Sequence, residues 1–354
     1  MKLAIISVTN AGAQLSEKIA QNFNNVDIFA KSGRNLLEYG NEYESLSTLI
    51  AEIFDQYDAF VFIMATGIVV RVIAPFIQDK RTDPAVIVAD ESGNHVISLL
   101  SGHIGGANDL ARFIAESINA APVITTATDV GNKPAVDVLA VKLGLKFELF
   151  ENVKKINAAI VNGDNVDFFL DYTLPESHCY VKTATELGIA LYDQMVLPQA
   201  SNYYALVLIT DKELSVDSLH IFLRPPTLAV GIGCRRGTTK EEIVAAILTA
   251  CKMIGRSANS IAVIGSTVLK QDEQGLLDTV QALDVPIEFY DNEQIAITIE
   301  KNKLDVSSFV NEKIGVGNVC EAAALLASQN TKILLPKTKF NRVTVAIAQV
   351  RSLS

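Results

Sequence analysis

Short apolar runs that stop abruptly at polar or glycine residues constrain the fold of this chain more than any other feature. Two of them, residues 68–73 and 85–89, lie in the stretch 65–108, which is also rich in charged residues, histidine and glycine. Such runs are typical of buried parallel strands. Residues that follow parallel strands gather at one edge of the sheet, where open α/β sheets bind ligands. We therefore expect a ligand site along this stretch.

The first third of the chain alternates strand-like and helix-like segments. We expect residues 3–8 to form a first strand rather than a signal peptide, because Ser7, Thr9 and Asn10 interrupt the apolar run. The further expected strands are 60–64, 68–73, 85–89, 96–100 and 122–125, and the expected helices include 46–54, 106–118 and 136–143. This alternation predicts a parallel sheet with helices on both faces.

The pattern changes near residue 151 and again at Pro225-Pro226. Short strands with few helices are expected at 168–172, 179–183, 189–192, 204–210 and 219–223. An α/β pattern returns from residue 228, and its helix after residue 237 carries a capping box at Thr238 with Glu241 or at Thr239 with Glu242. We predict two α/β domains with mainly parallel sheets, 1–147 and 227–354, joined by a small α+β middle domain, 148–226.

Composition narrows the classes of partner. The 354 residues include 30 Lys and Arg against 40 Asp and Glu, a formal charge of −10, with no basic run. Nucleic acid and anionic membranes are therefore poor partners, and the apolar run 59–70 is too short to span a bilayer. The four cysteines are scattered without a CxxC pair, which argues against a zinc ribbon or a thioredoxin-like motif and favours reduced thiols in the cytoplasm.

Residues that could transfer protons lie in the stretch 90–103. His103 follows Ser101-Gly102, but a nucleophile elbow would need glycine where Leu99 stands. His103 suits a general acid or base at neutral pH, and a plain histidine at a helix entry is an equal alternative. Asp90 and Glu91 are either acid/base groups or members of a polar turn. The histidine spacing does not favour a protein-bound metal.

Several residues could hold an anionic ligand. Arg71, Lys80, Arg81 and Lys133 could form a basic patch, although each alone is more often a surface charge. Thr126 could bind a ligand or cap a turn. In the turn Gly231-x-Gly233-x-x-x-Gly237 the third glycine is one place late for a dinucleotide fingerprint. Backbone N–H groups there, with Arg235 and Arg236, could instead hold carboxylates, or the two arginines are solvated.

Six blocks of this sequence resemble one known family. MATGIVVRVIAP, DKRTDPAVIVADESGNHVISLLSGHIGGAN and PVITTATD are similar to the N-terminal region of the cobalt-precorrin-5A hydrolase family, CbiG, of anaerobic cobalamin biosynthesis. GIGCRRGTTKEEI, EKIGVGNVCEAAALLAS and NRVTVAIAQV resemble its C-terminal domain, which is also similar to the stand-alone protein CobE. The resemblance covers the first and last thirds of the chain; the middle third matches by position only.

The resemblance implies a hydrolase that opens the δ-lactone of cobalt-precorrin-5A with water and releases acetaldehyde to give cobalt-precorrin-5B. It implies no separate cofactor, because the cobalt belongs to the substrate, a macrocycle fringed with carboxylates. The ligand-binding edges of the two α/β domains could hold this substrate between them. We expect His103, with Asp90 or Glu91 as alternatives, to transfer protons. The expected substrate-binding residues are Arg71, Lys80, Arg81, Ser101, Gly102, Gly105, Gly106, Asn108, Thr126, Gly233, Arg235 and Arg236.

Two other functions stay open on the sequence. A non-catalytic corrinoid carrier is suggested by the CobE-like part, and it would bind the corrinoid without changing its mass. A nicotinamide-dependent oxidoreductase is suggested by the glycine turn, and it would respond to NAD(P)H. A homodimer and direct transfer of the product to neighbouring pathway enzymes are also open.

Overall fold

The computed structural model describes residues 1–34, 40–79, 81–131, 133–193, 204–305 and 318–351. Contacts divide the chain into two compact units, Met1–Val141 and Lys142–Ser354. Three sheets of mainly parallel strands with accompanying helices are described, one in the first unit and two in the second. This confirms the α/β fold class. Within these residues, no helix is both long and apolar enough to cross a membrane.

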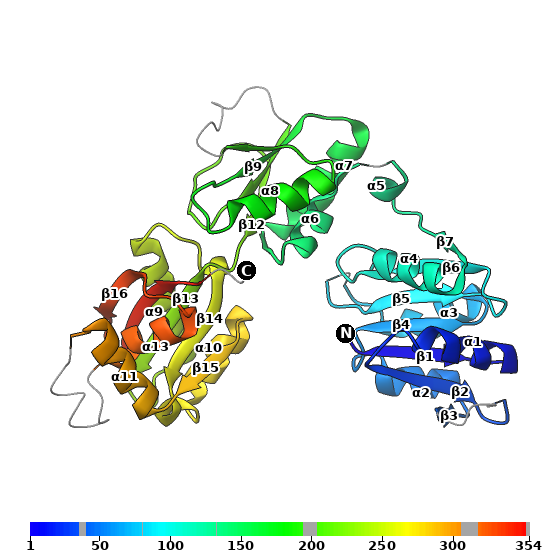
Figure 1. The fold of residues 1–354 in the computed structure, drawn as a ribbon, viewed down its shortest axis with the longest axis horizontal. Helices are drawn as coiled ribbons and strands as arrows, with labels where there is room; N and C mark the ends of the chain where they lie inside the picture. The colour runs from blue at the N-terminus through cyan, green and yellow to red at the C-terminus, as the bar shows by residue number, and fades with distance from the viewer. Residues whose placement is uncertain (35–39, 80, 132, 194–203, 306–317, 352–354) are drawn as a thin grey trace. The chain divides into compact units, whose positions relative to one another are not determined.

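The first unit is built on a seven-stranded sheet of order β3-β2-β1-β4-β5-β6-β7 (Figure 1). Its strands are β1 Leu3–Ser7, β2 Val26–Lys31, β3 Asn41–Tyr43, β4 Ala59–Ile63, β5 Ala85–Ala89, β6 His95–Leu100 and β7 Ala121–Val123. Its helices are α1 Asn10–Ala20, α2 Leu46–Ile53, α3 Thr66–Ile73, α4 Ala107–Ile118, α5 Ala127–Val130 and α6 Val136–Lys142, with a 3-10 turn η1 Ala74–Phe76. Helix α6 reaches one residue past the division between the units.

Helices cover both faces of this sheet because its central strands are apolar on both sides. Strands β1, β4 and β5 are buried at every position. One core holds α1 and α4 against side chains such as Ile5, Val61 and Ile87. The other holds α2 and α3 against the opposite faces of the same strands. This is the doubly covered parallel sheet that the continuous apolar runs predict.

One strand expected in this unit is wrong. Residues 68–73 form most of helix α3 rather than a strand. Parallel strands β4 and β5 need a crossover between them, and α3 provides it by burying Val69 and Ile73, four residues apart on one helix face. The sheet is mainly parallel, as predicted: β6 is antiparallel to β5, and β7 is parallel to β6.

The second unit begins with a five-stranded sheet of order β10-β9-β11-β12-β8. Its elements are β8 Lys146–Glu148, η2 Phe150–Asn152, α7 Val153–Asn162, β9 Val166–Leu170, α8 Ser177–Glu186, β10 Leu191–Asp193, β11 Ala205–Ile209 and β12 His220–Arg224. Apart from β8, these strands are parallel. The strand expected at residues 179–183 is wrong, because α8 occupies this segment as the crossover between parallel β9 and β10.

The rest of the second unit is a five-stranded sheet of order β15-β14-β13-β17-β16. Its elements are β13 Leu228–Cys234, α9 Lys240–Met253, η4 Ala258–Ser260, β14 Ile261–Thr267, η5 Val268–Lys270, α10 Gln274–Leu283, β15 Ile287–Tyr290, α11 Asn292–Asn302, α13 Val319–Ser328, β16 Ile333–Lys339 and β17 Val343–Gln349. Helix α9 begins with the capping box of Thr239 and Glu242. Helices α9 and α10 share one core with the sheet, and α13 packs against its other face.

Candidate functional site

The glycine-rich link between β6 and α4 is a tight turn. Ser101 adopts a left-handed backbone conformation, with φ of 58°, which is uncommon for a residue with a side chain. Its carbonyl oxygen accepts the N–H of Ala107 at 3.1 Å, and its hydroxyl donates to the carbonyl of Asp83 at 3.0 Å. Gly105 is needed for closure, because a Cβ there would lie 2.5 Å from the Cβ of Ser101. The turn therefore fixes the position of His103 at the end of β6.

Two carboxylates hold the imidazole of His103. Its Nδ1 lies 3.2 Å from Oδ2 of Asp137 on α6, and its Nε2 lies 2.7 Å from Oδ2 of Asp129 on α5. The hydroxyl of Thr128 is 3.3 Å from Nε2. The His103 side chain is only 9% exposed, so these contacts replace much of its hydration.

The carboxylates favour the protonated imidazole. Burial by itself lowers the pKa of His103, but the hydrogen bonds and negative charges of Asp137 and Asp129 outweigh it and raise this pKa above its ordinary 6.5. Burial by itself raises the pKa of Asp129, whereas hydrogen bonds from Arg112 and His103 bring it below its ordinary value. This arrangement favours the protonated imidazole between the side chains of Asp129 and Asp137, a form suited to donating a proton.

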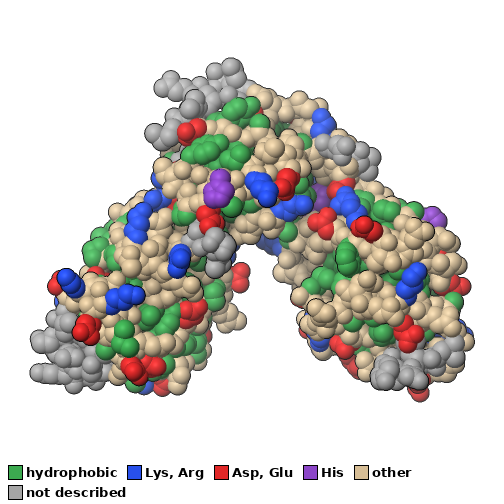
Figure 2. Space-filling model, viewed as in Figure 1, with side chains coloured by type: hydrophobic (Ala, Val, Ile, Leu, Met, Phe, Trp, Pro, Cys, Tyr) green, Lys and Arg blue, Asp and Glu red, His purple; other side chains and the backbone are tan. Residues whose placement is uncertain are grey.

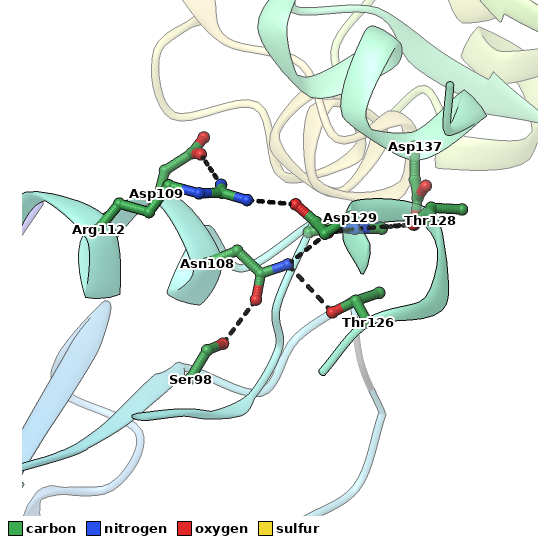
Figure 3. Close-up of polar contacts among 9 residues, drawn as sticks. Ser98, Asn108, Asp109, Arg112, Thr126, Thr128, Asp129 and Asp137 are labelled. Atoms are coloured by element: carbon green, nitrogen blue, oxygen red, sulfur yellow. Dashed lines mark hydrogen bonds and ion pairs between the residues drawn. The ribbon is translucent and has the colours of Figure 1, made fainter. Parts of the chain in front are cut away.

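Asn108 joins this group to the sheet (Figure 3). From the first turn of α4, its Oδ1 accepts the hydroxyl of Ser98 at 2.7 Å. Its Nδ2 donates to the hydroxyl of Thr126 at 3.1 Å and to Oδ2 of Asp129 at 3.0 Å. Asn108 is buried, and these bonds connect β6, α4 and α5. We call His103, Asn108, Thr126, Asp129 and Asp137 the His103 cluster.

The structure brings together seven of the predicted site residues in the first unit. The turn and the cluster contain Ser101, Gly102, His103, Gly105, Gly106, Asn108 and Thr126. Gly106 is the left-handed N-cap of α4, and the carbonyl of Gly102 accepts the N–H of Asn108 at 2.9 Å.

Asp90 and Glu91 lie at the opposite edge of the sheet. Asp90 and Glu91 follow β5, whereas His103 follows the antiparallel strand β6. The two acidic residues and His103 are therefore separated by the length of the six-residue strand β6, about 20 Å. The expectation of a single edge that carries all these side chains is therefore wrong. Asp90 accepts the backbone N–H groups of Ser92, Asn94 and His95 as a turn residue. Glu91 accepts the hydroxyl of Thr9 at 2.7 Å.

Two arginines of the predicted basic patch in the first unit contact nearby residues of the chain. The guanidinium of Arg71 donates to the carbonyl of Gly67 within α3 at 3.0 Å. Exposed Arg81 makes two hydrogen bonds of 2.8 Å to Asp79. Lys80 lies outside the described residues.

The predicted residues of the last sheet separate into two environments. Gly233 and Arg235 line a cavity of about 450 Å³ at the ends of β13 and β14. Arg236 is 69% exposed and pairs with Asp272 at 2.9 Å. Among the described residues, there is no cluster of His, Cys, Asp or Glu side chains that could hold a metal ion.

Sequence reasoning missed the two carboxylates that hold His103. Asp129 lies in the block PVITTATD, but the sequence interpretation drew attention to its threonines. Asp137 occupies a buried position of α6 between Val136 and Leu139. An acidic residue on the apolar face of an expected helix is a signal for a buried partner, because ionised side chains are rarely buried without one.

Comparisons with known proteins match the chain to three regions of one family. Residues 48–129 match the family model described as cobalamin synthesis G N-terminal, residues 134–225 the cobalamin biosynthesis central region, and residues 228–348 the cobalamin synthesis G C-terminus. The three matches follow one another along the chain and include the middle third.

Individual relatives agree with these matches. A cobalt-precorrin-5A hydrolase of Priestia megaterium is 31% identical over 98% of this chain and 94% of that protein. A cobalt-precorrin-5A hydrolase of Salmonella typhimurium is 40% identical over 78% of each chain. Protein CobE of a Sinorhizobium species is 28% identical over 34% of this chain and 79% of CobE.

Proposed function

This chain belongs to the cobalamin synthesis G family of cobalt-precorrin-5A hydrolases, and from that premise we propose that the His103 cluster carries out the proton transfers of the reaction. The chain is an enzyme of cobalamin biosynthesis, a hydrolase that acts on cobalt-precorrin-5A. The cobalt arrives with the substrate, so the proposed chemistry uses protein side chains and water alone. The four cysteines are free thiols, which supports a cytoplasmic location.

The proposed reaction has two parts. Water adds to the lactone carbonyl, and the ring C–O bond breaks to give a carboxylate and an alcohol. The alcohol then loses its proton as the adjacent C–C bond breaks, which releases acetaldehyde. The electron pair left on the macrocycle takes up a proton. The alcohol oxygen must gain a proton in the first part and lose one in the second, so one group that donates and accepts protons suits both.

The observation that carries this proposal is the pair of carboxylates on the two ring nitrogens of His103. Asp137 on Nδ1 fixes the orientation of the ring. Nε2, beside Asp129 and Thr128, is then the nitrogen that exchanges protons with the substrate. The imidazolium donates to the leaving oxygen, and the neutral imidazole that results recovers this proton when the C–C bond breaks. The charge that develops on the carbonyl oxygen is stabilised by backbone N–H groups of the turn 101–106.

The test compares two histidines at opposite ends of strand β6. His103→Asn removes the proposed proton donor, whereas His95→Asn removes a histidine that is 60% exposed. Acetaldehyde release from cobalt-precorrin-5A is measured anaerobically. We expect His103→Asn to lower kcat at least about 100-fold and His95→Asn to leave it within about twofold.

A third variant separates proton transfer from a merely structural role. Asp137→Asn removes the charge on Nδ1 and keeps the size of the side chain, so the pKa of His103 should fall and the pH profile of kcat should shift to lower pH. Melting curves show whether each variant is folded. Wild-type turnover by folded His103→Asn would refute the role of His103. Corrinoid binding by the wild type without any change of corrinoid mass would refute hydrolysis and favour a carrier.

A further inference from the structure

The cavity at the ends of β13 and β14 has a basic lining. Of its thirteen lining residues, five are Lys or Arg and none is Asp or Glu. The basic residues are Arg235, Lys270, Lys337, Lys339 and Arg342. The chain as a whole has ten more acidic than basic residues, and Figure 2 shows the two kinds interspersed on the viewed face. The lining therefore differs from the average surface in the direction that attracts anions.

The topology of the sheet explains why these cations meet. Strands β13 and β14 are parallel, so Arg235 and Lys270, which follow them, lie at the same edge. Strand β17 is antiparallel to β13 and pairs Val343 with Cys234, which brings the β16–β17 turn to that edge as well. The carboxyl ends of parallel strands are where open α/β sheets bind ligands.

Hydrogen bonds fix the turns around this cavity. The N–H of Arg235 donates to the carbonyl of Arg342 at 3.0 Å, and Nη2 of Arg342 donates to the carbonyl of Arg236 at 2.7 Å. Within the part of the chain that the structure describes, Nε of Arg342 is buried without an acceptor. A buried guanidinium donor without an acceptor is costly, and a ligand carboxylate could satisfy it.

Most basic side chains of this lining have no described carboxylate within ion-pair distance, although the backbone N–H of Lys337 donates to Oε1 of Glu321 at 2.7 Å. Lys270 pairs with Glu273 at 3.3 Å. For Arg235, Lys337 and Lys339, no ion pair occurs among the described residues. Apolar side chains of Val319, Phe340 and Val343 complete the lining. Carboxylates attached to an apolar frame fit this combination of cations and apolar surface.

We infer that this cavity binds a carboxylate-bearing edge of the corrinoid substrate, an inference that rests on the proposed function. A volume of about 450 Å³ is within the range of small-molecule sites but is smaller than a complete macrocycle with its side chains. The cavity therefore takes up side-chain carboxylates and leaves the ring outside. Its contribution is to substrate binding, and proton transfer belongs to the His103 cluster.

The test uses two ligands with the same ring, one with charged carboxylates and one with uncharged esters. Cobyrinic acid is a cobalt corrinoid with free carboxylates, and its methyl ester has the same ring without these charges. Binding of each to the full chain is measured by titration. Lys337→Gln/Lys339→Gln removes two cavity charges. Lys301→Gln/Lys332→Gln removes two charges from exposed positions of the same part of the chain and serves as the matched control.

We expect the cavity variant to weaken binding of the free acid at least about tenfold and to leave ester binding unchanged. The control should bind both ligands as the wild type does. Added salt should reduce the difference between acid and ester. Arg235→Gln provides an independent second variant with the same expected pattern. Wild-type affinity of the cavity variants for the acid, or equal losses for acid and ester, would overturn the inference.

Turnover distinguishes this inference from the proposed function. If the wild type releases acetaldehyde and the cavity variant has an unchanged KM, the inference fails while the function stands. If the wild type releases no acetaldehyde but the acid and the ester differ as expected, the function fails while the inference stands.

Discussion

Substitution of Gly231 by alanine should destabilise the second unit severely. A Cβ at this position of β13 would lie 1.8 Å from the carbonyl oxygen of Cys320 and 2.6 Å from the backbone nitrogen of Ala324, both in α13. Ordinary van der Waals contact begins at 3.4 Å, so the oxygen is about 1.6 Å too close. The obstacle is helix backbone, and a change of side-chain rotamer cannot relieve it.

The cost follows from what must move. Helix α13 buries eight of its ten residues and packs directly on β13, β14 and β17. Displacing it separates alanine-rich surfaces that are in close contact. Overpacking of a core ordinarily costs about 1 to 3 kcal/mol, and a clash with backbone should cost about 3 kcal/mol or more. For a unit of this size, that lowers the Tm by roughly 6 to 12 °C.

Gly233→Ala is the matched control, two residues further along β13. Its Cβ would meet the hydroxyl of Thr344 at 2.7 Å, a side-chain atom that can rotate away. We expect a cost of about 1 kcal/mol. Both variants are measured by urea denaturation and thermal melting of the full chain. A Gly231→Ala variant as stable as Gly233→Ala would refute the explanation of this glycine by close helix packing.

Three further predictions use the same methods. Because the pKa of His103 is raised in the folded chain, its stabilising contribution is complete below a pH of about 6.5 and is lost as the pH rises through the folded pKa. The difference in unfolding free energy between wild type and His103→Asn should therefore shrink from pH 6 to pH 9. A constant difference would contradict the direction of the shift. Arg224 is fully buried and binds Glu148 through Nε and Nη2 at 2.9 Å each. Arg224→Ala should therefore lower the free energy of unfolding by about 3 to 5 kcal/mol in urea titrations. A loss below about 1 kcal/mol would count against a stabilising role of this ion pair. Glu91→Gln should keep kcat within about twofold, because Glu91 and His103 lie at opposite edges of the sheet; a loss comparable to that of His103→Asn would show that both act in one site.

The sequence predicted the α/β class because the buried strands are continuous apolar runs. Strand 85–89 and helix α4 match the expectation closely, and the Thr239 capping box is one of the two that were predicted. The strand predicted at residues 68–73 is wrong because Val and Ile favour strands by local preference. The connection between parallel β4 and β5 is instead a helical crossover. Tertiary topology overrode local preference.

The direction of β6 could have been predicted. Only residues 90–94 separate β5 from β6, and a link this short cannot join parallel neighbours, which need a crossover of a dozen or more residues. That argument would have placed Asp90 and His103 at opposite edges. The partners of His103 were harder to find, because Asp129 and Asp137 follow it by 26 and 34 residues. A single sequence does not show which distant carboxylate folds back onto an imidazole.

One measurement tests the hydrolysis mechanism most directly. The wild-type chain is incubated anaerobically with cobalt-precorrin-5A in water enriched in oxygen-18, with acetaldehyde trapped and the corrinoid product analysed by mass. Attack of water on the lactone carbonyl predicts acetaldehyde in equal amount to the corrinoid product and one oxygen-18 atom in the new carboxylate. A corrinoid product without the label, or no acetaldehyde from active substrate, would contradict lactone hydrolysis by this chain.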